Sequence, residues 1–349
     1  SFDIAHDRSK PYFGTPLVPS AFATQGVNGV VVTNDGRTVD ARMLRQNYNV
    51  TDSDMSALTT WTKLKANWQP TDWMEFRNQT YYYTAKRDWM SAETYTLDAG
   101  TQQLGRDRFL VQHDQSVIGD RLEVQLNHPI AGFKNRFVSG IDFTYTDFKR
   151  PSFFNGAVDT VDPFSPNQGL FGGGSTALQT ATILDTAFFA EDQFSVTDRL
   201  KLVAGTRTDA IHLDREGFTA TGASNALQTF SQNFTATTWR AGVVYDVLPE
   251  ATVYGQYATA VDPVSSSLFV ARANQKFELA TGMQWEVGAK GQFWNKRAEW
   301  TVAYFDIVRK NILTQISQID ALNVGRQSSK GVELDVAAKL TDAWRIQGN

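Results

Sequence analysis

The 349-residue sequence contains no cysteine. This absence excludes disulfide frameworks, cysteine-based zinc sites and thiol catalysis within the chain. The sequence also has no unbroken apolar run of about 18 residues, which excludes membrane-spanning helices. It leaves membrane-spanning β-strands open, because their alternation of apolar and polar residues is hidden in averaged hydropathy.

Positive charge is not in excess either. Lysine and arginine number 33 against 37 aspartates and glutamates, which gives a net charge of −4 and argues against a nucleic-acid partner. The four histidines show no metal-ligand spacing such as H-E-x-x-H, and no G-x-S-x-G nucleophile elbow is present. The sequence therefore predicts no catalytic residue, no metal site and no resident cofactor.

Short polar turns and long irregular connections alternate along the chain. Turn residues such as Pro, Asp, Asn and Gly mark the short turns. These turns lie at 69–72, 128–132, 197–198, 249–250, 295–297 and 341–342. Longer connections lie at about 88–108, 149–180, 215–233, 261–281 and 314–322. This order would place all short turns at one end of a sheet and all long loops at the other, as in outer-membrane barrels.

The segments between turns alternate with a period of two residues. In 331–340, Val332, Leu334 and Val336 interleave with polar neighbours such as Glu333 and Asp335. The same alternation occurs in 121–127, 200–209, 239–247 and 285–293. A period of two indicates β-strands and does not fit a helix.

Segment length favours strands that cross a membrane. Several runs continue for about 10–15 residues, whereas strands of soluble proteins are typically about 5–6 residues long and a tilted spanning strand needs about 9–11. A soluble β-sandwich or propeller remains the alternative. Tryptophans near the short turns suit a membrane-interface girdle, although cross-strand aromatic pairing explains them as well. They are Trp68, Trp73, Trp294, Trp300 and Trp344.

Five segments resemble strands of TonB-dependent outer-membrane receptors, and their order and spacing match that family. They are 187–202 (AFFAEDQFSVTDRLKL), 203–209 (VAGTRTD), 254–260 (YGQYATA), 304–312 (YFDIVRKNI) and 329–334 (SKGVEL). The segment 11–17 (PYFGTPL) resembles an outer-loop motif of the ferric-siderophore branch. The second segment departs from the family pattern, because threonine stands where an apolar residue and a tyrosine are usual.

The resemblance implies an all-β fold, an antiparallel transmembrane β-barrel with short periplasmic turns and long extracellular loops. About twelve strands of a 22-stranded barrel are expected here. Residues 1–56 are expected to form an extracellular loop region leading into the barrel, and residues 57–349 its strands. No plug domain is recognisable, and we expect an internal barrel fragment whose open edges other strands complete, since unpaired backbone groups are costly in lipid.

The implied function is uptake of ferric siderophores across the bacterial outer membrane, not enzyme catalysis. The implied partners are the ferric siderophore, the TonB energy-coupling complex acting through a plug, and outer-membrane lipid and lipopolysaccharide. Iron would be cargo only. Inward-facing charges such as Glu286 and Glu333 would contact a plug or line water.

Arginines and aromatic residues near the outer strand ends suit an oxygen-rich, aromatic and often anionic ligand. The predicted ligand-binding set is Tyr12, Phe13, Tyr81, Tyr83, Arg87, Trp89, Arg106 and Arg108. The alternative role for each is an aromatic girdle or a lipopolysaccharide-facing surface. Other functions also stay open: a passive porin, an extracellular β-rich binding or adhesion protein, or a receptor for haem, cobalamin or an oligosaccharide.

Overall fold

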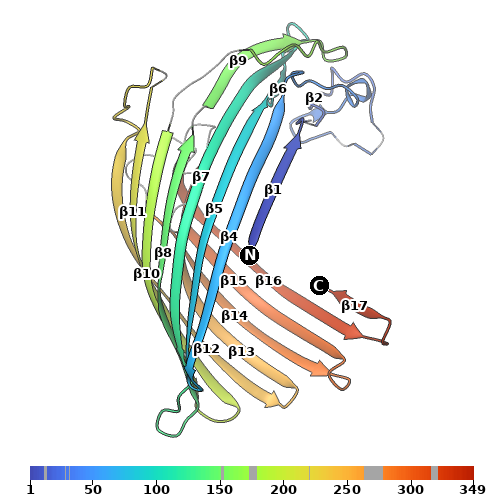
Figure 1. The fold of residues 1–349 in the computed structure, drawn as a ribbon. Helices are drawn as coiled ribbons and strands as arrows, with labels where there is room; N and C mark the ends of the chain where they lie inside the picture. Colours follow the sequence, from blue (N-terminus) through green and yellow to red (C-terminus); the bar gives the residue numbers. More distant parts are fainter. Residues whose placement is uncertain are drawn as a thin grey trace.

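The computed structural model describes residues 1–11, 14–27, 29–30, 32–150, 153–172, 179–219, 221–262, 278–315 and 321–349. These residues form one strongly curved antiparallel sheet of fifteen strands, with a small layer of loops at one end (Figure 1). No helix in the described ranges is long and apolar enough to cross a membrane.

Neighbouring strands of the sheet follow chain order, so the sheet is a meander of hairpins. Its main path is β1 (Phe2–Ser9), β4 (Asp54–Thr71), β5 (Met74–Ser91), β7 (Leu104–Leu126), β8 (Asn135–Arg150), β10 (Gln179–Ser195), β11 (Leu200–Gly217), β12 (Phe230–Leu248), β13 (Ala251–Asp262), β14 (Ala280–Phe293), β15 (Ala298–Gln315), β16 (Ala321–Lys339) and β17 (Arg345–Gly348). Two further strands, β6 (Tyr95–Leu97) and β9 (Phe153–Val161), pair with the far end of β7.

All six short turns predicted from the sequence separate consecutive strands of this path. They gather at the lower end of the sheet in Figure 1, and the described parts of the long connections at 88–108 and 149–180 lie at the upper end. The strands are longer than predicted, because β5, β7 and β11 extend into the expected loops. At 314–322, β15 ends at Gln315 and β16 begins at Ala321, so the described residues at both ends of that expected loop belong to strands.

One segment of the predicted extracellular loop region is a strand instead. Phe2–Ser9 forms β1 and pairs with β4 over its whole length, from Phe2 opposite Thr62 to Ser9 opposite Met55. Its apolar alternation is limited to Phe2 and Ile4, followed by a polar stretch, so the period-two signal is too short to detect. The strand β4 begins at Asp54, three residues before the predicted boundary.

Alternation along the strands divides the sheet into two chemically different faces. The outward face carries exposed large apolar side chains, among them Leu64, Ile141, Phe188, Val287, Val332 and Leu334. An aromatic row crosses β12, β13 and β14 on this face, with ring centroids 4.8 Å apart for Trp239 and Tyr257 and 4.5 Å for Tyr257 and Trp285. Such a face matches a lipid-facing apolar band with an interfacial aromatic girdle.

The opposite, lumen face carries a continuous chain of ion pairs across β5, β7, β8 and β11. Its links are Arg77–Glu75 (2.7 Å), Arg77–Glu123 (3.4 Å), Arg121–Glu123 (3.4 Å), Arg121–Asp142 (3.9 Å), Arg207–Asp142 (2.9 Å) and Arg207–Asp209 (2.7 Å). Each acid in this chain contacts at least one arginine, so the charges offset one another along the wall. This face suits a polar barrel interior.

Glycines on the lumen face make room for rings from the neighbouring strand. A Cβ atom at Gly119 would clash with the Tyr81 ring, and one at Gly140 would lie 2.7 Å from the Phe189 ring. Each ring therefore lies over the glycine of the neighbouring strand and occupies the space that a side chain would fill there. Aromatic residues cover glycines in this way in curved sheets.

The loop layer lies at the upper end of the sheet (Figure 1). We define it as the described residues of 14–53, with β2 (Val18–Pro19), β3 (Arg37–Thr38) and the 3₁₀ helix η1 (Ala41–Met43), together with β6, β9 and 162–172. Its core contains Val18, Met43, Tyr48, Leu104 and Val161, all buried. The segment before β4 is thus packed against strands that lie far away in sequence.

Candidate functional site

Four of the predicted ligand-binding residues lie on one face of β5. Tyr81, Tyr83, Arg87 and Trp89 are separated by even numbers of residues, and strand alternation places them all on the lumen face. At about 3.3 Å per residue they span about 26 Å along the wall. Tyr82, between the two inner tyrosines, points to the outward face and is exposed.

A tryptophan that the sequence analysis did not select completes this aromatic surface. Trp61 of β4 lies directly opposite Tyr83. Its ring is stacked on Tyr81 at a centroid distance of 5.9 Å and meets Tyr83 edge-on at 5.1 Å. Counting outward from the predicted turn at 69–72 would have paired Trp61 with Thr80 on the outward face, because β4 continues to Thr71 and the register shifts between Trp68 and Thr71.

Cations flank the rings on the same face. The Lys63 ammonium lies 5.2 Å from the Trp61 ring centroid, and the Arg87 guanidinium lies 4.6 Å from that of Trp89. The Trp89 indole N–H donates to Ser91 Oγ at 2.8 Å, which fixes its orientation. We name Trp61, Lys63, Tyr81, Tyr83, Arg87 and Trp89 the lumen strip.

Arg106 and Arg108 do not join this strip. Arg87 lies opposite His113 and Trp89 opposite Val111 on β7, so the even-numbered arginines further along β7 belong to the other face. Both are buried, with exposed fractions of 1% and 5%. The sequence predicted that both arginines join Arg87 and Trp89 in one ligand-binding set, because all four lie near the same expected loop. Nearness along the chain does not show which face of the sheet each side chain points to.

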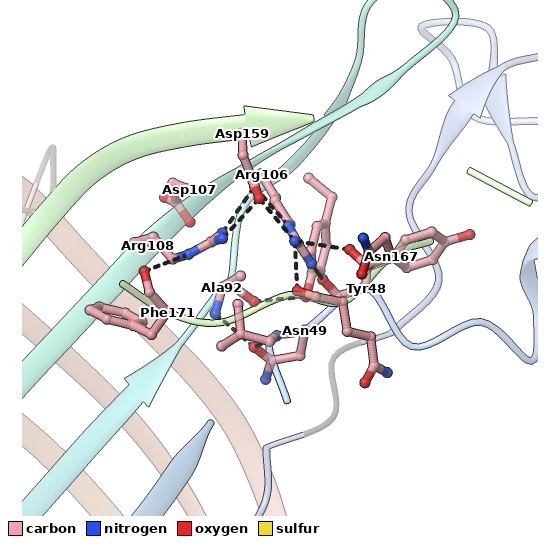
Figure 2. Close-up of polar contacts among 12 residues, drawn as sticks. Tyr48, Asn49, Ala92, Arg106, Asp107, Arg108, Asp159, Asn167 and Phe171 are labelled. Carbon is pink, nitrogen blue, oxygen red and sulfur yellow. Dashed lines mark hydrogen bonds and ion pairs between the residues drawn. The ribbon is translucent and has the colours of Figure 1, made fainter. Parts of the chain in front are cut away.

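The two buried arginines hold the loop layer together through Asp159 (Figure 2). Arg106 donates to its two carboxylate oxygens at 2.7 and 2.9 Å, and Arg108 does so at 3.0 and 2.8 Å. Their remaining N–H groups donate to backbone carbonyls, and Tyr48 O accepts from Arg106 at 2.6 Å and Phe171 O from Arg108 at 3.1 Å. We call Arg106, Arg108 and Asp159 the loop clamp.

Asn49 ties the same segment to β5. Its side-chain amide donates to Pro11 O at 2.9 Å, and its side-chain oxygen accepts from the backbone N–H of Ala92 at 2.8 Å. The clamp and Asn49 thus join three segments: the one before β4, the end of β5 and the connection after β9. Together these segments cover the upper end of β5 and β7. Nothing in the sequence indicates these contacts, because their partners lie 38 to 63 positions apart.

Tyr12 and Phe13 lie outside the described residues, and their predicted role stays a prediction. No group of three or more potential metal ligands occurs within the part of the chain that the structure describes.

The clamp predicts a specific effect of Asp159→Asn. The amide cannot accept from both guanidinium groups as a carboxylate does, and two buried cations lose their counter-charge. Because the Asp159 carboxylate is 44% exposed and partly screened by solvent, we expect local opening of the loop layer to become easier by about 1 kcal/mol, equivalent to roughly fivefold faster proteolysis within 14–53. Limited proteolysis of intact cells measures this, with Asp7→Asn, an exposed aspartate on β1, as the matched control. Equal cleavage rates in both variants would contradict the clamp.

The clamp also predicts a pH dependence. Burial raises the pKa of Asp159, but hydrogen bonds from Arg106 and Arg108 outweigh it and lower the pKa to about 2. Because the folded value lies below the ordinary value of about 3.9, the stabilisation is complete above that value and is lost as pH falls through the folded value. Hydrogen exchange within 40–53, corrected for intrinsic rates, should stay constant from pH 7 to 5 and rise from pH 4 to 2. If the exchange rate of the Asp159→Asn variant rises by the same amount between pH 4 and 2, groups other than Asp159 cause the rise.

Comparison with known proteins places this geometry in a family. A family model described as "TonB dependent receptor-like, beta-barrel" matches residues 3–349. The catecholate siderophore receptor Fiu of Escherichia coli O157:H7 is 22% identical over 98% of this chain and 49% of its own length. The probable TonB-dependent siderophore receptor PiuA of Acinetobacter baumannii is 28% identical over 48% of this chain and 23% of its own length.

The fold agrees with this result. The crystal structure of the ferric-catecholate import receptor Fiu from E. coli K12, in its closed form, superposes with a TM-score of 0.79 at 17% identity, covering 99% of this chain and 54% of that chain. The chain therefore spans about half the length of Fiu, and its curved sheet matches part of that receptor's barrel. The chain belongs to the TonB-dependent receptor-like β-barrel family, an outer-membrane family of transporters rather than enzymes.

Proposed function

We propose that the protein containing this chain takes up ferric siderophores through the outer membrane. The observation that carries the proposal is the lumen strip, a run of aromatic rings with cations beside them on the inner wall of β4 and β5. The names of its relatives, siderophore receptors at low identity, support the same substrate class.

The chemistry of the strip suits such a ligand. Ferric siderophore complexes present oxygen-rich, often aromatic and often anionic surfaces. Aromatic faces bind aromatic rings by offset or edge-on contacts worth about 0.5–1.5 kcal/mol each beyond area burial. The exposed guanidinium of Arg87 can donate charge-assisted hydrogen bonds to ligand oxygens while keeping its contact with Trp89.

The proposed mechanism follows from the position of these groups. The ligand would be captured at the mouth by the upper end of the lumen strip and would then descend along the inner wall. Energy for that passage would come from the TonB complex acting on a plug domain, as the family implies. The ion-pair chain of the lower lumen wall, from Glu75 to Asp209, would face that plug. Iron is cargo in this mechanism.

Neighbouring residues on opposite faces provide the test. We expect Tyr81→Ala/Tyr83→Ala to weaken binding of the ferric complex of 2,3-dihydroxybenzoylserine about tenfold, because two ring contacts are lost. Arg87→Gln should weaken the same anionic complex and leave cationic ferrioxamine B unchanged. The matched controls are Tyr82→Ala and Lys86→Gln, which alter the outward face of the same strand.

Binding is measured by quenching of tryptophan fluorescence and uptake by accumulation of radioactive iron, in cells with equal amounts of each variant in the outer membrane. If Tyr82→Ala loses as much binding affinity as the double variant, the lumen strip does not form the binding site. Full uptake by all variants would leave siderophore transport possible but independent of the strip. Uptake of neither complex by the unmodified protein would contradict the proposed function.

A further inference from the structure

A hydrogen-bonded row of side chains continues from Trp89 past the end of β5. The Trp89 indole N–H donates to Ser91 Oγ at 2.8 Å, and the Ser91 hydroxyl donates to Glu93 Oε1 at 3.0 Å. Trp89 belongs to the lumen strip, but Ser91 and Glu93 do not, and the sequence analysis did not select either of them. We call Trp89, Ser91 and Glu93 the relay.

The Ser91 hydroxyl needs an acceptor, because Ser91 is completely buried, with an exposed fraction of 0%. A hydroxyl has one hydrogen to donate and rotates to suit its partners. An ionised carboxylate only accepts, so Glu93 directs that hydrogen away from Trp89 and leaves the oxygen lone pairs to accept from the indole. Without the carboxylate, the hydroxyl would be free to turn, and the indole N–H would lose its fixed partner.

Glu93 is unfavourable for stability where it lies. Its side chain is half-buried, and burial is the main cause that raises the pKa of its carboxyl above the ordinary value. Hydrogen bonding within the relay, rather than an ion pair, is the largest effect that opposes this increase. Burying a carboxylate without a paired cation is costly, so its presence here indicates a use for its acceptor oxygens.

The backbone beside Glu93 is held independently of the relay. The N–H groups of Glu93 and Thr94 donate to Asp107 Oδ1 at 3.2 and 3.0 Å. The N–H group of Ala92 donates to Asn49 Oδ1 at 2.8 Å (Figure 2). A change of the Glu93 side chain therefore leaves these backbone contacts in place and breaks only the relay.

We propose that Glu93 is a positioning residue for ligand binding, which acts through Ser91 to hold the Trp89 indole in the lumen strip. The ligand in this inference rests on the proposed function, whereas the relay itself does not. A fixed indole keeps its contact with the Arg87 guanidinium, 4.6 Å from the ring centroid. A side chain that is ordered before binding loses less conformational entropy when the ligand arrives, so Glu93 raises affinity without touching the ligand.

Fluorine NMR of the detergent-purified whole protein tests the relay without any ligand. With 5-fluorotryptophan incorporated, the Trp89 resonance is identified by its loss in Trp89→Phe. We expect Ser91→Ala and Glu93→Ala each to shift and broaden this resonance, because the indole gains alternative orientations. Glu93→Gln keeps an acceptor oxygen and should leave it sharp. Glu216→Ala removes an exposed carboxylate on β11 and is the matched control, which should leave the resonance unchanged.

Equilibrium binding of a ferric complex labelled with radioactive iron tests the role in affinity. We expect Glu93→Ala and Ser91→Ala each to weaken binding of ferric 2,3-dihydroxybenzoylserine about fivefold, close to the usual net contribution of one hydrogen bond. Glu93→Gln should retain most of the affinity. In a Trp89→Phe background, which has no indole N–H, neither alanine substitution should weaken binding further. A merely structural role of Glu93 would give the same loss in both backgrounds.

The outcomes separate the inference from the proposed function. An unshifted, sharp Trp89 resonance in Glu93→Ala would overturn the relay. A changed resonance with unchanged affinity, or equal losses in both backgrounds, would overturn its role in binding. If the unmodified protein binds no ferric siderophore, the proposed function fails, and the Trp89 resonance still decides whether Glu93 acts through Ser91. If Glu93→Ala does not fold, Glu93→Met removes the acceptor oxygens and keeps the volume.

Discussion

Hydrogen bonding between neighbouring strands is the constraint on which the rest of this structure depends. A backbone that crosses lipid has no water to bind, so each N–H and C=O group must find a partner in an adjacent strand. A paired strand presents successive side chains to opposite environments. Tyr82 therefore faces outward while Tyr81 and Tyr83 face the lumen, and one residue of register decides whether a ring faces lipid or the barrel interior.

The loop layer depends on different forces, because it lies beyond the end of the membrane-spanning ladder. A small apolar core around Met43 and Leu104 is supplemented by buried charge, and Arg106 and Arg108 share the carboxylate of Asp159. Buried guanidinium groups are stable only when paired and hydrogen-bonded, and here backbone carbonyls from distant segments satisfy them. The arginines thus fix where the loops lie relative to the lumen strip.

Local patterns made much of the fold predictable. The turns at 197–198 and 249–250 carry breaker residues, and the runs beside them alternate over a full membrane thickness, so both were found from sequence. The strand Phe2–Ser9 was missed because most of it is polar. Long-range contacts could not be predicted from the sequence, because nothing near Arg106 indicates that its partner is Asp159. By contrast, a shared face could be predicted for four residues of one strand, because they are separated by even numbers of positions. They are Tyr81, Tyr83, Arg87 and Trp89.

The face that each side chain of β5 presents can be measured directly, because the chain contains no cysteine. Single cysteines at positions 82 and 83 can be labelled with bimane in bilayers containing brominated lipid. The register of β5 predicts strong quenching for the label of Tyr82→Cys and little for that of Tyr83→Cys. Equal quenching at both positions, or the reverse order, would contradict the register of β5 and with it the lumen strip.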